Sequence, residues 1–292
     1  MTAPAPAPAR RAPVRPASRV LFVLAVVGAL AGLFVFWLHA TGDPLNDVQA
    51  YYWAGSRLNA GLSLYPPDQS VATPLGYPYP PLLAILFRPL AVLPFDAAAA
   101  IWEVVVVASL VVTVWWSGFR RRTTWLALGI LALPIGWCVS IGQVQVLLTL
   151  LTAIGAPWSI ALATNVKLFP ALLTLWWIGR RDWRSLALFS ATLAGLAVVQ
   201  LLLAPQASLD YLTAISLHQV GEVQNISPYV VSPLLWGALL VIGAVVVLRL
   251  APSRCGWAAA VIFSVVATPR LLVYMFMTFL AALTTPNTHS RP

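Results

Sequence analysis

The sequence predicts an all-α protein that crosses a membrane several times. Of its 292 residues, 60% are apolar and only 9% are charged, and the mean hydropathy is +0.86. A soluble globular domain carries about 25% charged residues. Apolar runs of the length needed to cross about 30 Å of hydrocarbon also alternate with short arginine clusters. Because so few charges cannot cover a water-exposed surface, these observations exclude a soluble fold.

The net charge of +9 does not indicate a nucleic-acid partner. All the basic residues except Lys167 are arginines, and most lie in clusters between apolar runs, as the positive-inside rule predicts for cytoplasmic loops. The two cysteines, Cys138 and Cys255, and the scattered histidines form no metal-binding pattern. We therefore expect membrane lipids as partners, no nucleic acid, no metal and no cofactor.

The N-terminal segments define the expected topology. Residues 1–19 are rich in Pro and Ala with four Arg, which predicts a disordered cytoplasmic tail. The apolar run 20–38 is too long for the core of a signal peptide, so we expect an uncleaved anchor. This orientation makes residues 40–96 a first outer loop, in which residues 48–60 form a short amphipathic helix at the membrane interface.

The membrane domain is expected over residues 20–284, with a second outer loop at 205–228 and a C-terminal tail at 285–292. Further crossings are predicted at residues 97–119, 124–139, 142–155, 185–204 and 229–248. A single crossing by residues 158–179 would strand the next arginine cluster outside. We therefore expect a pair of short helices there, broken around residues 165–170, and a similar break at 268–270. Non-helical backbone at membrane depth is tolerated next to a protein-lined or watery cavity.

Four basic residues lie in the outer half of the predicted bundle, where topology does not require them: Arg57, Arg88, Lys167 and Arg270. Charge held at such a position marks function by default. Lys167, Arg270 and Arg57 can hold a lipid-linked phosphate, and Asp47 can take a proton from an attacking hydroxyl.

The cations would then stabilise the negative charge that develops on a departing phosphate. A structural alternative stays open, in which Lys167 and Arg270 are ion-pair partners of Asp210 or Glu222.

The first outer loop resembles the signature of glycosyltransferase family 87. The signature positions are Asp47, Tyr51, Ala54, Leu58, Gly61 and Tyr65. Further segments resemble the family's pattern in the same order along the chain: 77–81, 88–90, 93–94, 142–145, 165–170 with 180–184, 224–227, and 268–269 with Tyr274. Each match is short, and their joint occurrence over most of the chain is specific.

The resemblance implies a GT-C-like helical bundle that moves a hexose, mannose above all, from a polyprenyl-phosphate donor to a glycolipid or glycan hydroxyl. It also implies a multi-pass enzyme of the cell membrane with its active site on the outer face, which inverts the sugar by a single displacement. Asp47 aligns with the family's catalytic base, and Asp43 is the nearby alternative. The residues expected to line the substrate pocket are Asp43, Tyr51, Tyr79, Gln143, Asn165, His218 and Asn225.

Two other functions are compatible with the sequence. A transporter or flippase for a lipid or small anion would use the broken helices as a midplane site. A non-catalytic member of the family is the other alternative, because the segment around Arg270 lacks the expected aromatic and histidine residues. The chain also ends soon after Leu283, so we expect it to be short at its C-terminus compared with relatives.

Overall fold

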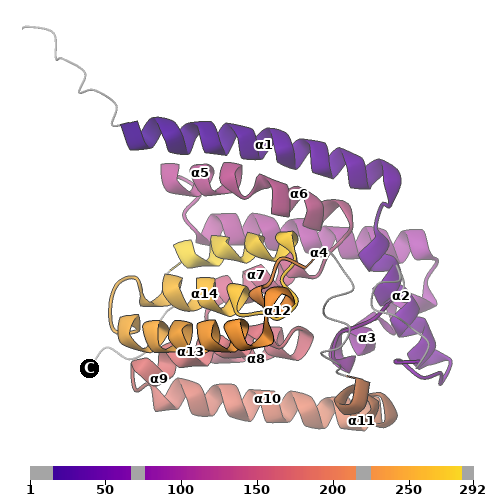
Figure 1. The fold of residues 1–292 in the computed structure, drawn as a ribbon. Helices are drawn as coiled ribbons and strands as arrows, with labels where there is room; N and C mark the ends of the chain where they lie inside the picture. The colour runs from indigo at the N-terminus through magenta and orange to yellow at the C-terminus, as the bar shows by residue number, and fades with distance from the viewer. Residues whose placement is uncertain (1–15, 67–75, 215–224, 285–292) are drawn as a thin grey trace, which may run out of the picture.

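The structure is a computed structural model that describes residues 16–66, 76–214 and 225–284, and every regular element in these ranges is helical (Figure 1). The elements, with 3-10 helices marked η, are α1 (Pro16–Gly42), α2 (Asn46–Asn59), α3 (Pro81–Phe87), η1 (Leu90–Val92), α4 (Phe95–Trp116), α5 (Arg122–Ile130), α6 (Ala132–Ser140), α7 (Gln145–Ile154), α8 (Pro157–Val166), η2 (Phe169–Leu173), α9 (Thr174–Gly179), α10 (Trp183–Leu203), α11 (Pro205–Ala214), α12 (Pro228–Val231), α13 (Pro233–Leu250), α14 (Gly256–Val266) and η4 (Val273–Leu283). The predicted all-α class is confirmed.

Four described helices are long and apolar enough to cross a membrane: α1, α4, α10 and α13. The pair α5 and α6 passes the same test together but is bent by 65°, so the count rises to five if this pair is one span. The apolar side chains of α1, α10 and α13 are mostly exposed at the edge of the bundle, where lipid would cover them. The chain is therefore a multi-pass membrane protein.

Prolines end three of the helices. Proline has no N–H to donate and its ring clashes with the carbonyl four residues earlier. Pro134 lies four residues after Ile130, the last residue of α5, and Pro170 lies four residues after Val166, the last residue of α8. Pro269 lies three residues after Val266, the last residue of α14.

The predicted breaks within 158–179 and at 268–270 are therefore present in the structure. Residues 124–139 were predicted to form one straight crossing. They instead form two helices, α5 and α6, with a bend between them, because Pro134 interrupts the helix. The crossing predicted at 142–155 is a helix of only 10 residues, α7. The predicted second outer loop begins with a helix, α11.

Two hydrophobic clusters hold the bundle together. One joins α2, α3, α4, α7 and η4 around large, fully buried side chains such as Tyr51, Phe87 and Met277. The other joins α8, α9, α13 and α14 around Trp176, Trp177 and Trp257. The core is thus built mainly from short helices together with parts of α4 and α13, while α1 and α10 lie at the edges of the bundle (Figure 1).

The two ends of the bundle differ in charge. The arginine clusters at residues 120–122, 180–184 and 249–254 belong to the α4–α5, α9–α10 and α13–α14 connections. These connections lie at the left in Figure 1, whereas α2, α3 and α11 lie at the right. The short helices of the first loop are therefore at the end opposite the clustered arginines.

Candidate functional site

The turn between α6 and α7 organises the candidate site. Helix α6 closes with a Schellman motif, in which the N–H of Gln143 bonds to the carbonyl of Cys138 at 2.8 Å and the N–H of Gly142 bonds to Val139 at 3.3 Å. Gly142 has φ +66°, which glycine adopts without the steric cost that other residues meet. A Cβ at this position would also overlap the side chain of Val48 on α2. The turn therefore needs glycine for its conformation and for its contact with α2.

Backbone hydrogen bonds join this turn to the start of α2. The N–H of Leu45 bonds to the carbonyl of Ser140, and the N–H of Asp47 bonds to the carbonyl of Ile141, both at 3.2 Å. The first turn of α2 and the end of α6 are thus held in register by the main chain. Asp47 and Gln143, which are 96 residues apart in sequence, become neighbours for this reason.

The side chain of Gln143 links Asp47 to two tyrosines. Gln143 Nε2 donates to Asp47 Oδ2. Gln143 Oε1 accepts from the hydroxyl of Tyr51 at 2.8 Å and from that of Tyr79 at 3.4 Å. Tyr51, Tyr79 and Gln143 are buried, while Asp47 is half-buried. Four residues expected at the site therefore form one hydrogen-bonded group.

Lys167 lies between α8 and η2, at the break that Pro170 imposes. Its side chain is buried, and its ammonium donates to Gln145 Oε1 at 2.9 Å. The Nζ atom also lies 5.3 Å from the ring centroid of Tyr79 and 4.9 Å from that of Tyr274, within the range of cation–π attraction. In the part of the chain that the structure describes, no carboxylate lies within ion-pair distance of Lys167.

Arg270 lies in the break between α14 and η4. Its Nε is buried and has no hydrogen-bond partner among the described residues. The segment that carries it is held by Asn225, whose Nδ2 donates to the carbonyl of Pro269 at 2.8 Å and whose Oδ1 accepts from the N–H of Leu271 at 2.9 Å. Asn225 thus stabilises the loop on both sides of Arg270.

The charges of these groups act on one another. Removal of water from around the carboxyl raises the pKa of Asp47 to about 6, from an ordinary value of 3.8. The positive charges of Lys167 and Arg270 act in the opposite direction, and the negative charge of Asp43 adds to the increase. Asp47 therefore lies in the field of both cations without forming an ion pair with either.

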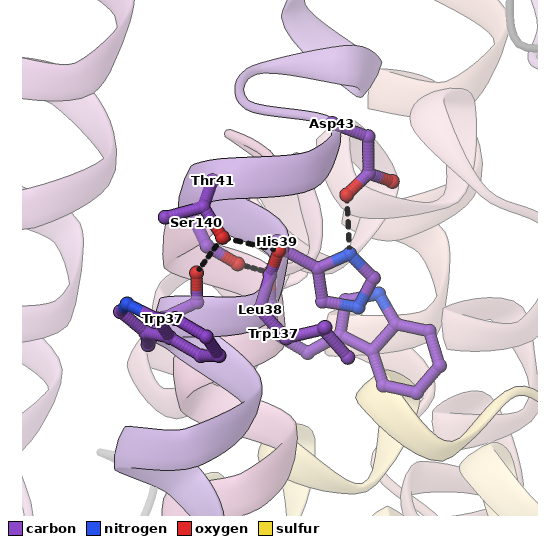
Figure 2. Close-up of polar contacts among 7 residues, drawn as sticks. All are labelled: Trp37, Leu38, His39, Thr41, Asp43, Trp137 and Ser140. Atoms are coloured by element: carbon purple, nitrogen blue, oxygen red, sulfur yellow. Dashed lines mark hydrogen bonds and ion pairs between the residues drawn. The ribbon is translucent and has the colours of Figure 1, made fainter.

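Asp43 has a different environment from Asp47. Its Oδ1 bonds to Nδ1 of His39 at 2.7 Å, and both residues lie near the end of α1 (Figure 2). The His39 ring stacks on Trp137 of α6, with ring centroids 4.9 Å apart. Asp43 is exposed, whereas Asp47 is half-buried and lies in the field of Lys167 and Arg270.

Two further expected site residues, Arg57 and Asn165, make their hydrogen bonds elsewhere. Arg57 is in the last turn of α2, about 15 Å along the helix axis from Asp47, and its Nε donates to the carbonyl of Ser63. Asn165 is buried and accepts from Gln200 Nε2 at 2.7 Å. His218 lies outside the described residues.

The sequence left open that Lys167 and Arg270 form ion pairs with Asp210 or Glu222. Asp210 accepts a hydrogen bond from Gln206, one turn earlier in α11, at 2.7 Å. Glu222 lies outside the described residues.

Two residues beside Lys167 were not among the expected site residues: Gln145, which accepts a hydrogen bond from its ammonium group, and Tyr274, whose ring lies against its charge. Both lie in segments that the family resemblance includes, so the motifs did contain a signal for them. Over residues 16–66, 76–214 and 225–284, no three His, Cys, Asp or Glu side chains gather as a metal site would require. The site consists of one carboxylate, two cations, amides and tyrosine rings.

Comparison with known proteins identifies the class to which this arrangement belongs. The sequence profile of glycosyltransferase family 87 matches residues 77–286, which is more than half of the chain. The chain belongs to this family of glycosyltransferases.

The chain is also similar to individual curated glycosyltransferases. The chain is 31% identical over 229 residues to a polyprenol-phosphate-mannose-dependent alpha-(1-2)-phosphatidylinositol pentamannoside mannosyltransferase of Mycolicibacterium smegmatis, which covers 72% of this chain and 55% of that protein. A protein of the same name from Mycobacterium tuberculosis is 29% identical over 79% of this chain and 58% of its own length. The chain thus spans a little over half the length of these relatives. No solved structure matches it significantly.

Proposed function

We propose that this protein is a membrane glycosyltransferase that moves mannose from a polyprenyl-phosphate donor to a hydroxyl of a lipid-linked or glycan acceptor, with Asp47 as general base. One observation carries the proposal: Lys167 and Arg270 lie close enough to Asp47 to lower its pKa, yet neither forms an ion pair in the described structure. A buried cation without a counter-ion is costly. A bound phosphate would relieve that cost and would lie beside the base.

The reaction follows from these positions. The acceptor hydroxyl gives its proton to the Asp47 carboxylate while its oxygen forms a bond to C1 of the sugar. The bond between C1 and the phosphate oxygen breaks, and its electron pair stays on that oxygen. Lys167 and Arg270 stabilise the negative charge that develops there. The products are the glycoside with inverted configuration at C1, the polyprenyl phosphate and a protonated Asp47.

The charge asymmetry of the bundle supports an active site on the outer face. The arginine clusters at residues 120–122, 180–184 and 249–254 lie at the end opposite α2, and arginine-rich connections stay on the cytoplasmic side. This orientation puts the N-terminus of α1 in the cytoplasm. A polyprenyl-phosphate sugar would then meet the site from the outer leaflet.

The names of the curated relatives support the choice of donor and acceptor. Those relatives are named as polyprenol-phosphate-mannose-dependent and as acting on phosphatidylinositol mannosides. We therefore propose mannose as the sugar and a phosphatidylinositol mannoside as the first acceptor to test. Tyr51, Tyr79, Gln143, Asn165, Asn225 and His218 remain candidates for the residues around the substrates.

The test is a transfer assay with radiolabelled polyprenyl-phosphate-mannose as donor and phosphatidylinositol mannosides as acceptor. Membranes that contain the wild-type protein are expected to transfer label into the acceptor lipid, and membranes with Asp47→Asn are expected to lose at least 99% of that transfer, because general-base catalysis contributes about 10²–10⁴-fold. Asp43→Asn is the matched control, four residues earlier in the chain, and is expected to keep most of the activity.

The same assay separates the rival functions. Movement of intact donor across the membrane without transfer of label would indicate a flippase. Absence of both activities in a folded wild-type protein would indicate a non-catalytic member. Full activity of Asp47→Asn would refute the base assignment, and full loss in Asp43→Asn with activity retained in Asp47→Asn would transfer the role to Asp43.

A further inference from the structure

The hydrogen bond from Gln143 to Asp47 has a direction that the surrounding residues impose. We propose that Gln143 is a positioning residue that holds the Asp47 carboxylate in the orientation for receiving the acceptor's proton, and that the Tyr51 hydroxyl determines which way the Gln143 amide points. This inference rests on the proposed function, because it assumes that Asp47 is the base. It goes beyond that function by assigning the two residues that orient the base.

The direction follows from the partners of the Tyr51 hydroxyl. The backbone N–H of Val144 donates to this oxygen at 3.2 Å, so the hydroxyl acts as acceptor there. Its single proton is then available for Gln143 Oε1, at 2.8 Å. Because Oε1 is held by this proton, and more distantly by that of Tyr79, the NH₂ group of Gln143 faces Asp47. The opposite amide orientation would set an oxygen against the carboxylate.

The bond leaves one oxygen of the base available. Gln143 donates to Oδ2 of Asp47. Within the described part of the chain, Oδ1 of Asp47 accepts no hydrogen bond from another side chain. A carboxylate held through one oxygen keeps its plane while the other oxygen receives a proton, and fixed orientation of a reacting group contributes strongly to catalysis.

The support for Gln143 is itself rigid. Gln143 is 1% exposed, and its backbone belongs to the Schellman motif that ends α6. Tyr51 is fully buried and its ring packs against Phe87 and Trp102, with centroid distances of 5.4 and 5.9 Å. Water therefore has little room to replace the Gln143 amide. A donor to the charged form also favours ionisation of Asp47, so its loss raises the pKa of Asp47.

The experiment measures kcat and the KM for polyprenyl-phosphate-mannose as functions of pH, with the purified full-length protein in lipid nanodiscs and phosphatidylinositol mannosides as acceptor. Gln143→Leu keeps most of the side-chain volume and removes all three side-chain hydrogen bonds of Gln143, to Asp47, Tyr51 and Tyr79. We expect kcat to fall by about 10- to 100-fold, the effect of one hydrogen bond to a charged group, with KM changed by less than about threefold. The acid limb of the pH profile should move to higher pH.

Tyr51→Phe removes only the hydroxyl that orients the amide. We expect a smaller loss in kcat, about fivefold, as for one neutral hydrogen bond, and an alkaline shift of the acid limb in the same direction. Tyr52→Phe is the matched control on the next residue of α2, because the hydroxyl of Tyr52 donates to the carbonyl of Leu93, away from Asp47. Its kcat, KM and pH profile should equal those of the wild type.

The outcomes separate this inference from the proposed function. If Asp47→Asn is inactive but Gln143→Leu and Tyr51→Phe keep the wild-type kcat and pH profile, the positioning role is refuted and the base assignment stands. A change in KM alone would also refute it, because that pattern indicates direct contact with substrate. If Asp47→Asn keeps its activity, both proposals fail. Should Gln143→Leu not fold, as judged by size-exclusion chromatography, the pH profile of Tyr51→Phe decides the question.

Discussion

Substitution of Gly142 by alanine tests whether the α6–α7 turn is built as the structure shows. A residue with a Cβ at φ +66° lies in the left-handed region, which costs about 1–2 kcal/mol. The new Cβ would also overlap the side chain of Val48 and lie 2.8 Å from Glu103 Oε1. Forcing extra volume into a packed site typically costs about 1–3 kcal/mol. Gly142→Ala is therefore expected to lower the free energy of unfolding by about 2–5 kcal/mol.

Substitutions at two other glycines separate the conformational cost from the cost of the close contact. Gly61 has φ +68°, but a Cβ added there would have no atom within 4 Å, so Gly61→Ala carries only the conformational cost, about 1–2 kcal/mol. Gly195 lies inside α10, has ordinary helical geometry and also has open space around it. Gly195→Ala is expected to be neutral or to stabilise by up to about 1 kcal/mol, because alanine favours the helix.

The assay is unfolding of the detergent-solubilised protein in sodium dodecyl sulfate, followed by tryptophan fluorescence. The expected order of stability is Gly195→Ala, then Gly61→Ala, then Gly142→Ala. Equal stability of Gly61→Ala and Gly142→Ala would refute the close contact with Val48. Because the turn also bonds to the backbone N–H of Asp47, Gly142→Ala should reduce the proposed mannosyl transfer even where the protein is folded, and Gly61→Ala should not.

Three further predictions concern charge and exposure. Since the pKa of Asp47 is raised to about 6 and the proposed base must be ionised, kcat/KM is expected to rise as the pH increases through about 6 and to fall in proportion to acidity below it. Lys167→Met removes a positive charge that lowers the pKa of Asp47, so the midpoint should move to higher pH; Arg57→Met, at the far end of α2, should leave it unchanged, and equal shifts in both variants would contradict the geometry. In the folded protein a maleimide should label Cys255, which is exposed, and not Cys138, which is buried; rapid labelling of Cys138 would show that the core around it is open.

The helix breaks were predictable because proline acts locally. The positions of Pro170 and Pro269, together with the adjacent charges, are enough to indicate both interruptions. The same rule applied to Pro134 predicts the bend between α5 and α6, where the apolar run had suggested a straight crossing. The location of Arg57 was also computable, since the rise of the predicted helix carries it about 15 Å from Asp47.

The contacts within the site were not predictable in this way. The motif residues indicated that Asp47, Gln143, Lys167 and Arg270 belong to one function, but residue spacing does not determine which side chains touch. That Gln143 binds Asp47, while Gln145, two residues later, binds Lys167, depends on the direction in which each side chain leaves the start of α7. These directions follow from the Schellman turn and its packing on α2.

Composition and local chemistry alone therefore determine that this chain is helical, lies in a membrane and breaks its short helices next to Lys167 and Arg270. A chain with so much apolar surface requires lipid around it, and a proline ends a helix within one turn. Both effects act without contacts to distant segments. Only the tertiary structure decides that the carboxylate of Asp47 is hydrogen-bonded to an amide 96 residues away and lies in the field of Lys167 and Arg270. Those relations arise from packing between remote segments, which no stretch of sequence contains.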